Sequence, residues 1–302
     1  MAKSRDAAKP STDSSALVLP FRVSDGKGFR LADHDPGKTL GLKSKGDAKE
    51  QLQRGVEQLA KLQEQLYAQD RLSVLVIVQA MDAAGKDSVI EHVMSGINPQ
   101  GCQVFAFKAP SPEELDHDFL WRTTRCMPER GRIGIFNRSY YEEVLVVRVH
   151  PEYLGGQRLP EPIDLKTIWR DRFESINAFE QHMARNGTVI LKFFLNVSKR
   201  EQKARFLERL DEPEKNWKFS LGDIKERDRW DEYMAAYEDM IQHTSTEHAP
   251  WHVIPADHTW FTRLAVAAAI EDRMSTLKLK QRTVDPARAQ ELKAARALLG
   301  KA

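Results

Sequence analysis

The stretch "LSVLVIVQAMDAAGKDSVI" (residues 72–90) decides the fold of this 302-residue chain. Residues 72–79 form an apolar, largely β-branched run, which is typical of a strand buried on both faces of a parallel sheet. A loop of small residues follows, ends in Gly85-Lys86 and leads directly into a helical segment. Backbone N–H groups of such a loop, the helix N-terminus and the lysine together favour phosphate binding. The sequence therefore predicts a strand, a phosphate-binding loop and a helix in succession.

Two positions of this loop depart from the usual phosphate-loop pattern. Ala80 stands where glycine is common, and alanine fits there only if its φ angle stays negative. Asp87 follows Lys86 where serine or threonine usually binds Mg²⁺, and Ser88 comes next. Asp82 also lies in the loop, where a carboxylate repels phosphate unless a metal ion or a proton mediates. We therefore expect Asp82 and Asp87 to bind metal, or Asp82 to act as a base on the phosphate acceptor.

Similar apolar runs recur along the chain and alternate with amphipathic helical patterns. Strands are expected at 102–107, 132–136, 188–197 and 251–256, in addition to 72–79. Helices are expected at 47–70, 88–96, 111–124, 140–150, 164–186, 198–210 and 259–277. This alternation predicts an α/β fold with a doubly wound parallel sheet in three layers, α/β/α. Trp230, Tyr233, Tyr237 and Met240 recur at spacings of three and four, which indicates a buried helix face.

Composition limits the class of protein. Hydrophobic residues make up 41% and charged residues 30%, as in ordinary globular proteins. No stretch approaches the ~20 apolar residues of a membrane helix, and two cysteines cannot form a disulfide scaffold, so we expect a cytoplasmic protein without a membrane partner. No nucleic-acid recognition motif occurs, and we expect no nucleic-acid partner. The net charge of +2 excludes a uniformly basic polyanion binder but allows a local cluster of cations.

Five blocks of the sequence resemble the type-2 polyphosphate kinases, which are P-loop phosphotransferases of the thymidylate-kinase-like sort. They include "QAMDAAGKDSVIEHVMSGINPQG" (79–101), "FKAPSPEELDHDFLWR" (107–122) and "GIFNRSYYEEVLVVRVHPE" (134–152). The other two blocks are residues 172–210 and 217–257. The resemblance runs from about residue 40 to 277, with the blocks in the family's order. The chain is therefore expected to contain a P-loop phosphotransferase domain (47–277). Residues 1–46 show no sustained hydrophobic period and are expected to form an extension, and residues 278–302 form a basic tail. The long polar run with interspersed aromatic residues at about 211–247 predicts a helical lid.

The resemblance implies phosphoryl transfer between inorganic polyphosphate and nucleotides. The expected direction is from polyphosphate to AMP and ADP, with GMP and GDP as further acceptors and Mg²⁺, or Mn²⁺ in its place, as cofactor. The "NRSYYE" block resembles the subgroup that acts on both mono- and diphosphates, whereas ADP-specific enzymes tend to carry Asp at Asn137. A homodimer or homotetramer is expected from the family and from the amphipathic faces.

Candidate site residues follow from position and from the resemblance. Arg138 follows a buried strand at the edge where open α/β sheets bind ligands, and its guanidinium suits phosphate, although it could instead pair with Glu142 or Glu143. Catalysis is assigned to Asp82, Lys86 and Arg138, and metal binding to Asp82 and Asp87. Polyphosphate binding is assigned to Ala83, Ala84, Gly85, Lys86, Asp87, Ser88, Arg205, Arg209, Lys215 and Lys218. Nucleotide binding is assigned to Asn98, Lys108, Asp116, Arg122, Asn137 and Arg138.

Several of these assignments have a structural alternative. Arg205 and Arg209 lie four apart on one helical face and could simply pair with neighbouring acids. Lys215 and Lys218 could be solvated surface lysines, and Trp217 between them is expected to anchor the lid rather than to stack on a base.

Two other functions remain open at this point. An ATP-dependent nucleoside monophosphate kinase would share the loop and the lid, and a noncatalytic polyphosphate-binding module would keep the cations without turnover. Incubation of AMP with polyphosphate in the absence of ATP distinguishes the first of these from a polyphosphate-dependent enzyme, and polyphosphate binding without turnover in Mg²⁺ would identify the second.

Overall fold

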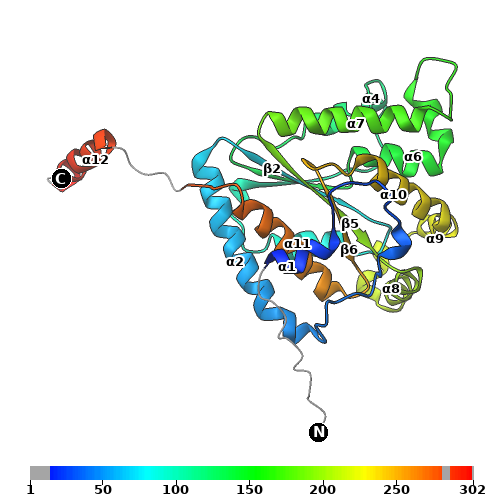
Figure 1. Ribbon diagram of the computed structural model, residues 1–302, viewed down its shortest axis with the longest axis horizontal. Coiled ribbons are helices and arrows are strands. Elements are labelled where there is room, and N and C mark those ends of the chain that lie inside the picture. Colours follow the sequence, from blue (N-terminus) through cyan, green and yellow to red (C-terminus); the bar gives the residue numbers. More distant parts are fainter. Residues whose placement is uncertain (1–13, 281–285, 301–302) are drawn as a thin grey trace, which may run out of the picture.

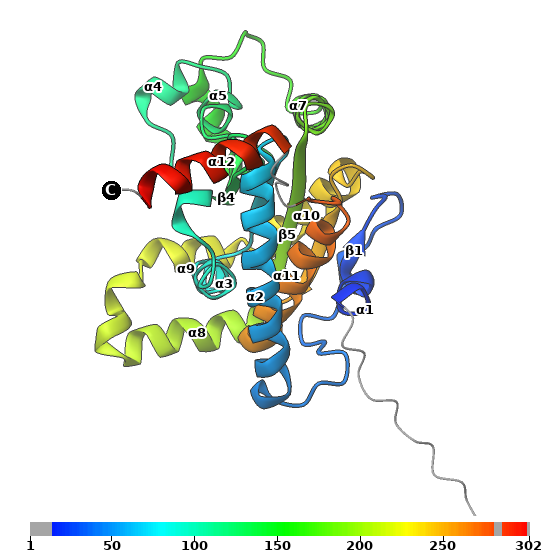
Figure 2. The same ribbon diagram turned by 90° about the vertical axis from the view of Figure 1, so that its left-hand side faces the viewer.

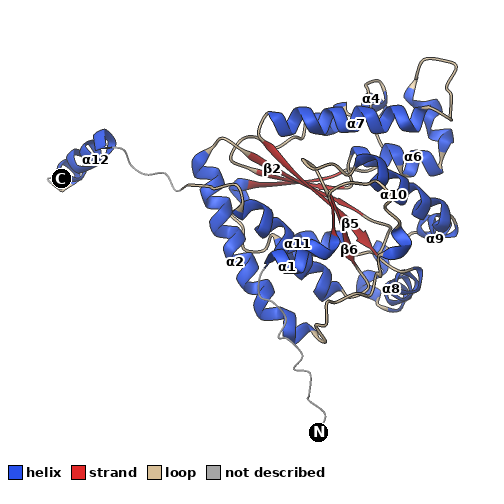
Figure 3. Cartoon of the chain, in the orientation of Figure 1, coloured by secondary structure: helices blue, strands red, loops and turns tan. Residues whose placement is uncertain are grey.

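The structure is a computed structural model that describes residues 14–280 and 286–300, except for the side chains of Asp47, Lys218 and Pro286. Figure 1 shows a central sheet with helices on both faces. The strands are β1 (Arg22–Val23), β2 (Ser73–Gln79), β3 (Cys102–Ala106), β4 (Ile133–Asn137), β5 (Thr188–Asn196) and β6 (Trp251–Pro255). Their order is β1-β6-β5-β2-β4-β3, with β2 to β6 parallel. The predicted three-layer α/β fold is confirmed (Figure 3).

The central strand β2 is buried along its whole length, as the apolar run predicts. It lies between β4 and β5, with Val76 opposite Ile135 on one side and Leu191 on the other. Because parallel strands end at the same edge, this register brings the ends of β2, β4 and β5 together. The loop after β2 therefore meets the residues that follow β4 and β5.

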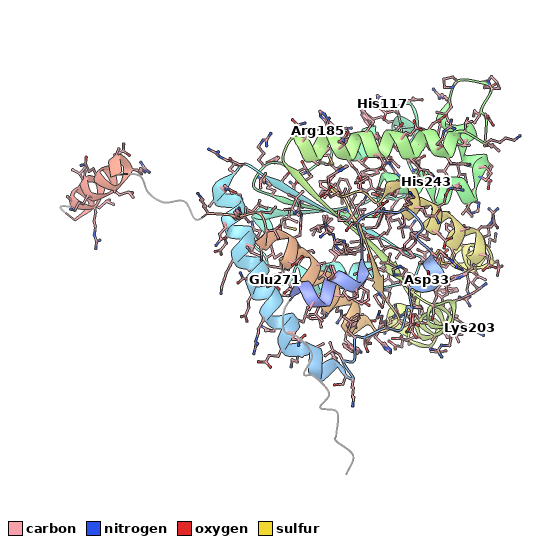
Figure 4. The ribbon with its side chains drawn as sticks, in the orientation of Figure 1. Asp33, His117, Arg185, Lys203, His243 and Glu271 are labelled. Carbon is pink, nitrogen blue, oxygen red and sulfur yellow. The ribbon has the colours of Figure 1, made fainter. Side chains whose placement is uncertain are left out.

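Two helical layers cover the sheet. One layer contains α1 (Ser14–Val18), α2 (Lys45–Gln69), α3 (Lys86–Val93) and α11 (Thr259–Ser275), which pack on one another. In Figure 4, Glu271 of α11 lies beside α1, where its carboxylate accepts a hydrogen bond from the Ser14 hydroxyl (2.9 Å). The other layer contains α6 (Val146–Val149), α7 (Ile168–Arg185) and α10 (Trp230–Thr244).

Helices α8 (Lys199–Asp211) and α9 (Leu221–Asp228) project from the carboxyl edge of the sheet (Figure 2). The 3₁₀ helix η6 (Pro213–Lys218) joins this pair, and α8, η6 and α9 are exposed over much of their surface. The predicted lid range, 211–247, also includes α10, whose face of Trp230, Tyr233, Tyr237 and Met240 is buried. The predicted buried helix face is therefore confirmed, and the projecting part of the range is limited to η6 and α9.

Residues 14–42 form part of the folded core. Strand β1 lies at the edge of the sheet and pairs antiparallel with β6. The sequence patterns do not predict β1, because it has only two residues. The segment also includes the 3₁₀ helices η1 (Leu19–Phe21) and η2 (Leu31–Asp33). Its buried residues include Leu17, Phe21 and Leu42. Residues 1–13 of the predicted extension lie outside the described chain.

Two expected helices are broken into shorter pieces. Residues 111–124 form α4 (Pro112–Leu115) and α5 (Trp121–Thr124), because the Asp118 carboxylate accepts a hydrogen bond from the Leu120 amide and favours a turn between them. Residues 140–150 form the 3₁₀ helix η4 (Tyr140–Val144) before α6. The remaining elements are η3 (Pro99–Gly101), η5 (Pro151–Gln157) and α12 (Pro286–Leu299).

Candidate active site

The loop after β2 turns sharply before α3 begins at Lys86. Gly85 has a φ of 101°, which only glycine adopts without steric cost, and Ala83 has a φ of 60°. The φ of Ala80 lies outside the left-handed region, so alanine fits at that position as the sequence required. Helix α8 supports the loop, because the Gln202 amide donates to the Asp82 carbonyl (2.9 Å) and the Arg205 guanidinium donates to the Ala83 carbonyl (3.0 Å).

The Lys86 ammonium lies against its own loop. It donates to the carbonyls of Ala80 (2.8 Å) and Met81 (3.2 Å), and it is 3.9 Å from the Asp82 carboxylate. Burial lowers the pKa of Lys86 and the charge of Asp82 opposes this effect. A carboxylate at 3.9 Å leaves room for a second anion to approach the ammonium.

Arg138 connects the end of β4 to the loop. Its guanidinium donates to the Asp82 carboxylate (2.7 Å) and lies 3.6 Å from the Glu142 carboxylate. Burial raises the pKa of Asp82, but the charges of Lys86, Arg138 and Arg209 outweigh it and hold the pKa below its ordinary value. Glu142 and Asp82 in turn raise the pKa of Arg138. The site therefore holds an ionised Asp82 carboxylate beside the Arg138 guanidinium at neutral pH.

Two hydrogen bonds fix the start of α3. Asn137, the last residue of β4, donates to the Asp87 carboxylate (2.6 Å). The Ser88 hydroxyl accepts a hydrogen bond from Arg263 of α11. Asn137 therefore holds an acidic side chain where an aspartate at the same position would repel it.

These groups border a cavity of about 660 Å³ at the carboxyl edge of the sheet. Its lining combines the loop, the residues after β3 and β4, and parts of α8, η6 and α9. The residues are Asp82, Ala83, Gly85, Lys86, Asp87, Ser88, Ala106, Phe107, Lys108, Ala109, Asn137, Arg138, Arg209, Trp217 and Asp223. The structure thus brings ten of the predicted site residues together from distant parts of the chain.

The sequence patterns miss Asp223 as a cavity residue. It lies on α9, and its carboxylate is 3.7 Å from the guanidinium of Arg209 on α8. Burial raises its pKa, as does the charge of Asp82. Its position in the polar run "SLGDIKERD" carries no signal that distinguishes it from a solvated acid. Trp217, expected to anchor the lid, also lines the cavity.

Other predicted phosphate-binding residues lie outside the cavity. Arg205 donates to the carbonyls of Ala256 (2.6 Å) and Asp257 (3.2 Å) as well as to Ala83, so it connects the loop to the end of β6. Ala84 is buried within the loop. Lys215 pairs with Glu208 (2.5 Å) and Glu212 (2.7 Å) at the surface. The side chain of Lys218 is outside the described part of the structure.

The predicted nucleotide-binding residues are also divided. Lys108, Asn137 and Arg138 line the cavity. Arg122 is buried and donates to the Lys108 carbonyl (2.7 Å), so it supports the backbone of a lining residue. Asn98 caps η3, since its side chain accepts a hydrogen bond from the Gln100 amide (3.0 Å), and Asp116 pairs with Arg158 (2.6 Å).

The donor set is compatible with a Mg²⁺ ion shared between protein and substrate. In the part of the chain that the structure describes, no group of three or more His, Cys, Asp or Glu residues could hold a metal ion. Mg²⁺ in phosphotransferases is usually bound by one or two carboxylates together with substrate phosphates and water. Asp82 and Asp87, the two acids predicted to bind metal, both line the cavity. No helix among the described residues is long and apolar enough to cross a membrane.

Comparisons with known proteins agree with this geometry. The family described as Polyphosphate kinase 2 (PPK2) matches residues 42–282. The ADP-polyphosphate phosphotransferase of Rhodopseudomonas palustris is 54% identical over 90% of this chain and 94% of its own. The AMP/ADP-polyphosphate phosphotransferase of Meiothermus ruber is 44% identical over 86% and 94%. The crystal structure of a polyphosphate kinase 2 from Arthrobacter aurescens TC1 has a TM-score of 0.86 and 40% identity, covering 100% of both chains.

Proposed function

The chain belongs to the polyphosphate kinase 2 family, and we propose that it transfers a phosphoryl group between inorganic polyphosphate and nucleotides. The expected acceptors are AMP and ADP, with GMP and GDP as further acceptors, and the main products are ADP and ATP. One observation carries this proposal. The cavity at the carboxyl edge of the sheet joins a phosphate loop to Lys86, Arg138 and Arg209, which come from three separate segments.

Phosphoryl transfer depends on in-line positioning and on neutralisation of charge at the transferred group. We assign Lys86 and Arg138 to that group, with Asp82 holding the guanidinium of Arg138 in place (2.7 Å). Arg209 would bind the polyphosphate chain farther along the cavity, where it now faces Asp223 (3.7 Å). The loop residues 83–88 would cradle the donor phosphates. Closure of η6 and α9 over the cavity would exclude water and limit hydrolysis.

We propose that Mg²⁺, for which Mn²⁺ can substitute, is held by Asp82 and Asp87 together with substrate phosphates. When bound, such an ion neutralises charge between the phosphates that exchange. Asn137 keeps the Asp87 carboxylate oriented by its hydrogen bond (2.6 Å). Because residue 137 is an asparagine, it adds no carboxylate to Asp82 and Asp87. Oxygens of the substrate phosphates would therefore complete the coordination of the metal ion.

The nucleotide would enter on the side of the cavity formed by Lys108, Asn137 and Arg138. Arg122 supports the backbone of Lys108 there, and Asn98 and Asp116 are proposed as more remote contributors. The asparagine at 137 supports acceptance of both mono- and diphosphates, as does the 44% identity to a Meiothermus ruber enzyme named AMP/ADP-polyphosphate phosphotransferase. We also propose roles in polyphosphate binding for four further residues. Arg205 and Ala84 would act by shaping the loop, and Lys215 and Lys218 would contact the chain of phosphates. We also propose that the protein is cytoplasmic and forms a homodimer or homotetramer. Light scattering of the purified chain would test the oligomeric state.

The direct test is to incubate the purified chain with Mg²⁺, long-chain polyphosphate and either AMP or ADP, without ATP. Formation of ADP and ATP is expected. An ATP-dependent monophosphate kinase would give no product until ATP is added. A noncatalytic module would bind polyphosphate without turnover, and either result would overturn the proposal.

A further inference from the structure

The backbone at Arg138 is held in an unfavourable conformation. Its φ is 65°, in the left-handed region that residues other than glycine rarely occupy. Such a conformation persists only when the surrounding structure determines it from several sides. On one side, the Arg138 amide donates to the Val78 carbonyl of β2 (3.1 Å). The anchor on the other side must come from the residues that follow, Ser139 to Glu142.

Those residues are bound to a fully buried cluster behind the site. The hydroxyls of Tyr140 and Tyr141 both donate to one oxygen of the Glu180 carboxylate (2.8 and 2.7 Å). The second oxygen of Glu180 accepts a hydrogen bond from the Lys192 ammonium (2.6 Å). All four side chains have zero exposed fraction. This buried cluster, Tyr140–Tyr141–Glu180–Lys192, links η4 to α7 and β5.

The cluster has no access to substrate. Lys192 also donates to the Tyr141 hydroxyl (2.9 Å) and to the Thr244 carbonyl (2.7 Å), so its three N–H groups have three acceptors. None of the four side chains of the buried cluster lines the cavity. A buried ion pair of this kind is costly to desolvate and is no more stabilising than well-packed apolar residues. Two members of the buried cluster, Tyr140 and Tyr141, lie only two and three residues after Arg138.

We propose that Tyr140, Tyr141 and Glu180 are positioning residues for Arg138. By fixing the chain two and three residues after the strained backbone, they keep the guanidinium between Asp82 and Glu142. Glu142 is itself held on the opposite side by the Gln79 amide (2.9 Å). The effect of the buried cluster on the reaction therefore passes through Arg138. This inference rests on the proposed role of Arg138 in the transfer.

The test uses Tyr141→Phe and Tyr140→Phe, which remove a hydroxyl and keep the ring packing. Glu180→Gln is less useful because it leaves the Lys192 charge buried without its partner and the chain could fail to fold. We expect each tyrosine variant to lower kcat for ADP about tenfold while KM for ADP changes less than about twofold, since the displacement affects the reacting group. In an Arg138→Lys background, the same substitutions are expected to change kcat less than about twofold, because coupled residues give non-additive effects.

Thr262→Val is the matched control. It removes a fully buried hydroxyl on α11, in the other helical layer, which donates to the Pro255 carbonyl at the end of β6 (3.0 Å). We expect a lower unfolding midpoint with unchanged kcat. An equal loss of kcat from Tyr141→Phe in both backgrounds, or no loss in the wild-type background, would overturn the inference. Arg138→Lys measured alone separates the two proposals, because an unchanged kcat there would overturn the proposed role of Arg138 itself.

Discussion

Two lysines with little exposed surface, one at the start of α3 and one within β5, have different surroundings. Lys86, after β2, contacts two loop carbonyls and has its nearest carboxylate at 3.9 Å. Lys192, within β5, has three close acceptors that include the Glu180 carboxylate at 2.6 Å. Burial lowers the pKa of both. Lys86 borders a cavity of about 660 Å³, whereas Lys192 has zero exposed fraction.

The difference separates a lysine that can bind substrate from one that cannot. A cation whose partners are neutral carbonyls and a distant carboxylate gains when a phosphate arrives. A cation with all of its hydrogen bonds made can only lose by moving. Burial alone therefore does not identify a catalytic lysine, and the completeness of its contacts does.

The largest effect is expected for Lys86→Ala. We predict that polyphosphate-dependent ATP formation falls by about 10³–10⁵-fold, the range seen when a charge-neutralising cation is removed from a phosphoryl-transfer site. The unfolding midpoint is expected to stay close to that of the wild type. Asp82→Asn is predicted to abolish transfer in the same assay, since it weakens the ion pair with Arg138 and removes a proposed metal ligand. ATP formation near the wild-type rate by either variant would remove these residues from the site.

Lys192→Met addresses the other lysine. It leaves the Glu180 carboxylate buried without its cation, and we predict a loss of about 3–5 kcal/mol in the free energy of unfolding, measured by urea denaturation. The double variant Lys192→Met/Glu180→Leu is expected to recover much of that loss, because no buried charge remains. If Lys192→Met were as stable as the wild type, the ion pair of Lys192 with Glu180 would not have the structural role assigned to it here.

A smaller effect is expected from His252 of β6, whose ring lies against the Lys192 carbonyl (3.3 Å). Burial lowers its pKa from 6.5 to about 4, so the unfolded chain binds a proton between these pH values that the folded chain does not. Its contribution to stability is present above pH 6.5 and is lost as the pH falls towards 4, by about 3 kcal/mol. His252→Gln should reduce the difference between unfolding free energies at pH 7 and pH 4.5. An unchanged difference would contradict a neutral, buried histidine at this position.

Lys215 offers an exposed lysine for comparison, and the smallest effect. It pairs with Glu208 and Glu212 at the surface and does not line the cavity. We predict that Lys215→Ala raises KM for long-chain polyphosphate by less than about threefold, because exposed charges act weakly through solvent. A tenfold rise would show that the polyphosphate chain runs over η6 beyond the cavity.

Sequence patterns predict the sheet and the loop well, because both depend on local signals. The apolar run before Ala80 and the Gly85-Lys86 pair predict a strand, a turn and a helix, and the structure contains all three. The strand β1 escapes detection because two residues show no period. The roles of Asp223 and Glu180 also escape, since one depends on the approach of two helices and the other on contacts between residues 39 and 40 positions apart.

The pairing of β1 with β6 has a consequence for how the chain folds during synthesis. Val23 lies opposite Trp251, so β1 finds its partner only after β6, more than 200 residues later, has been made. Until then, apolar residues such as Leu17 and Phe21 have no complete core to pack against. Native contacts between such distant segments form slowly and late. We therefore expect residues 17–23 to pack only after β6 has been made, and unpaired apolar segments of this kind are prone to aggregate until they do.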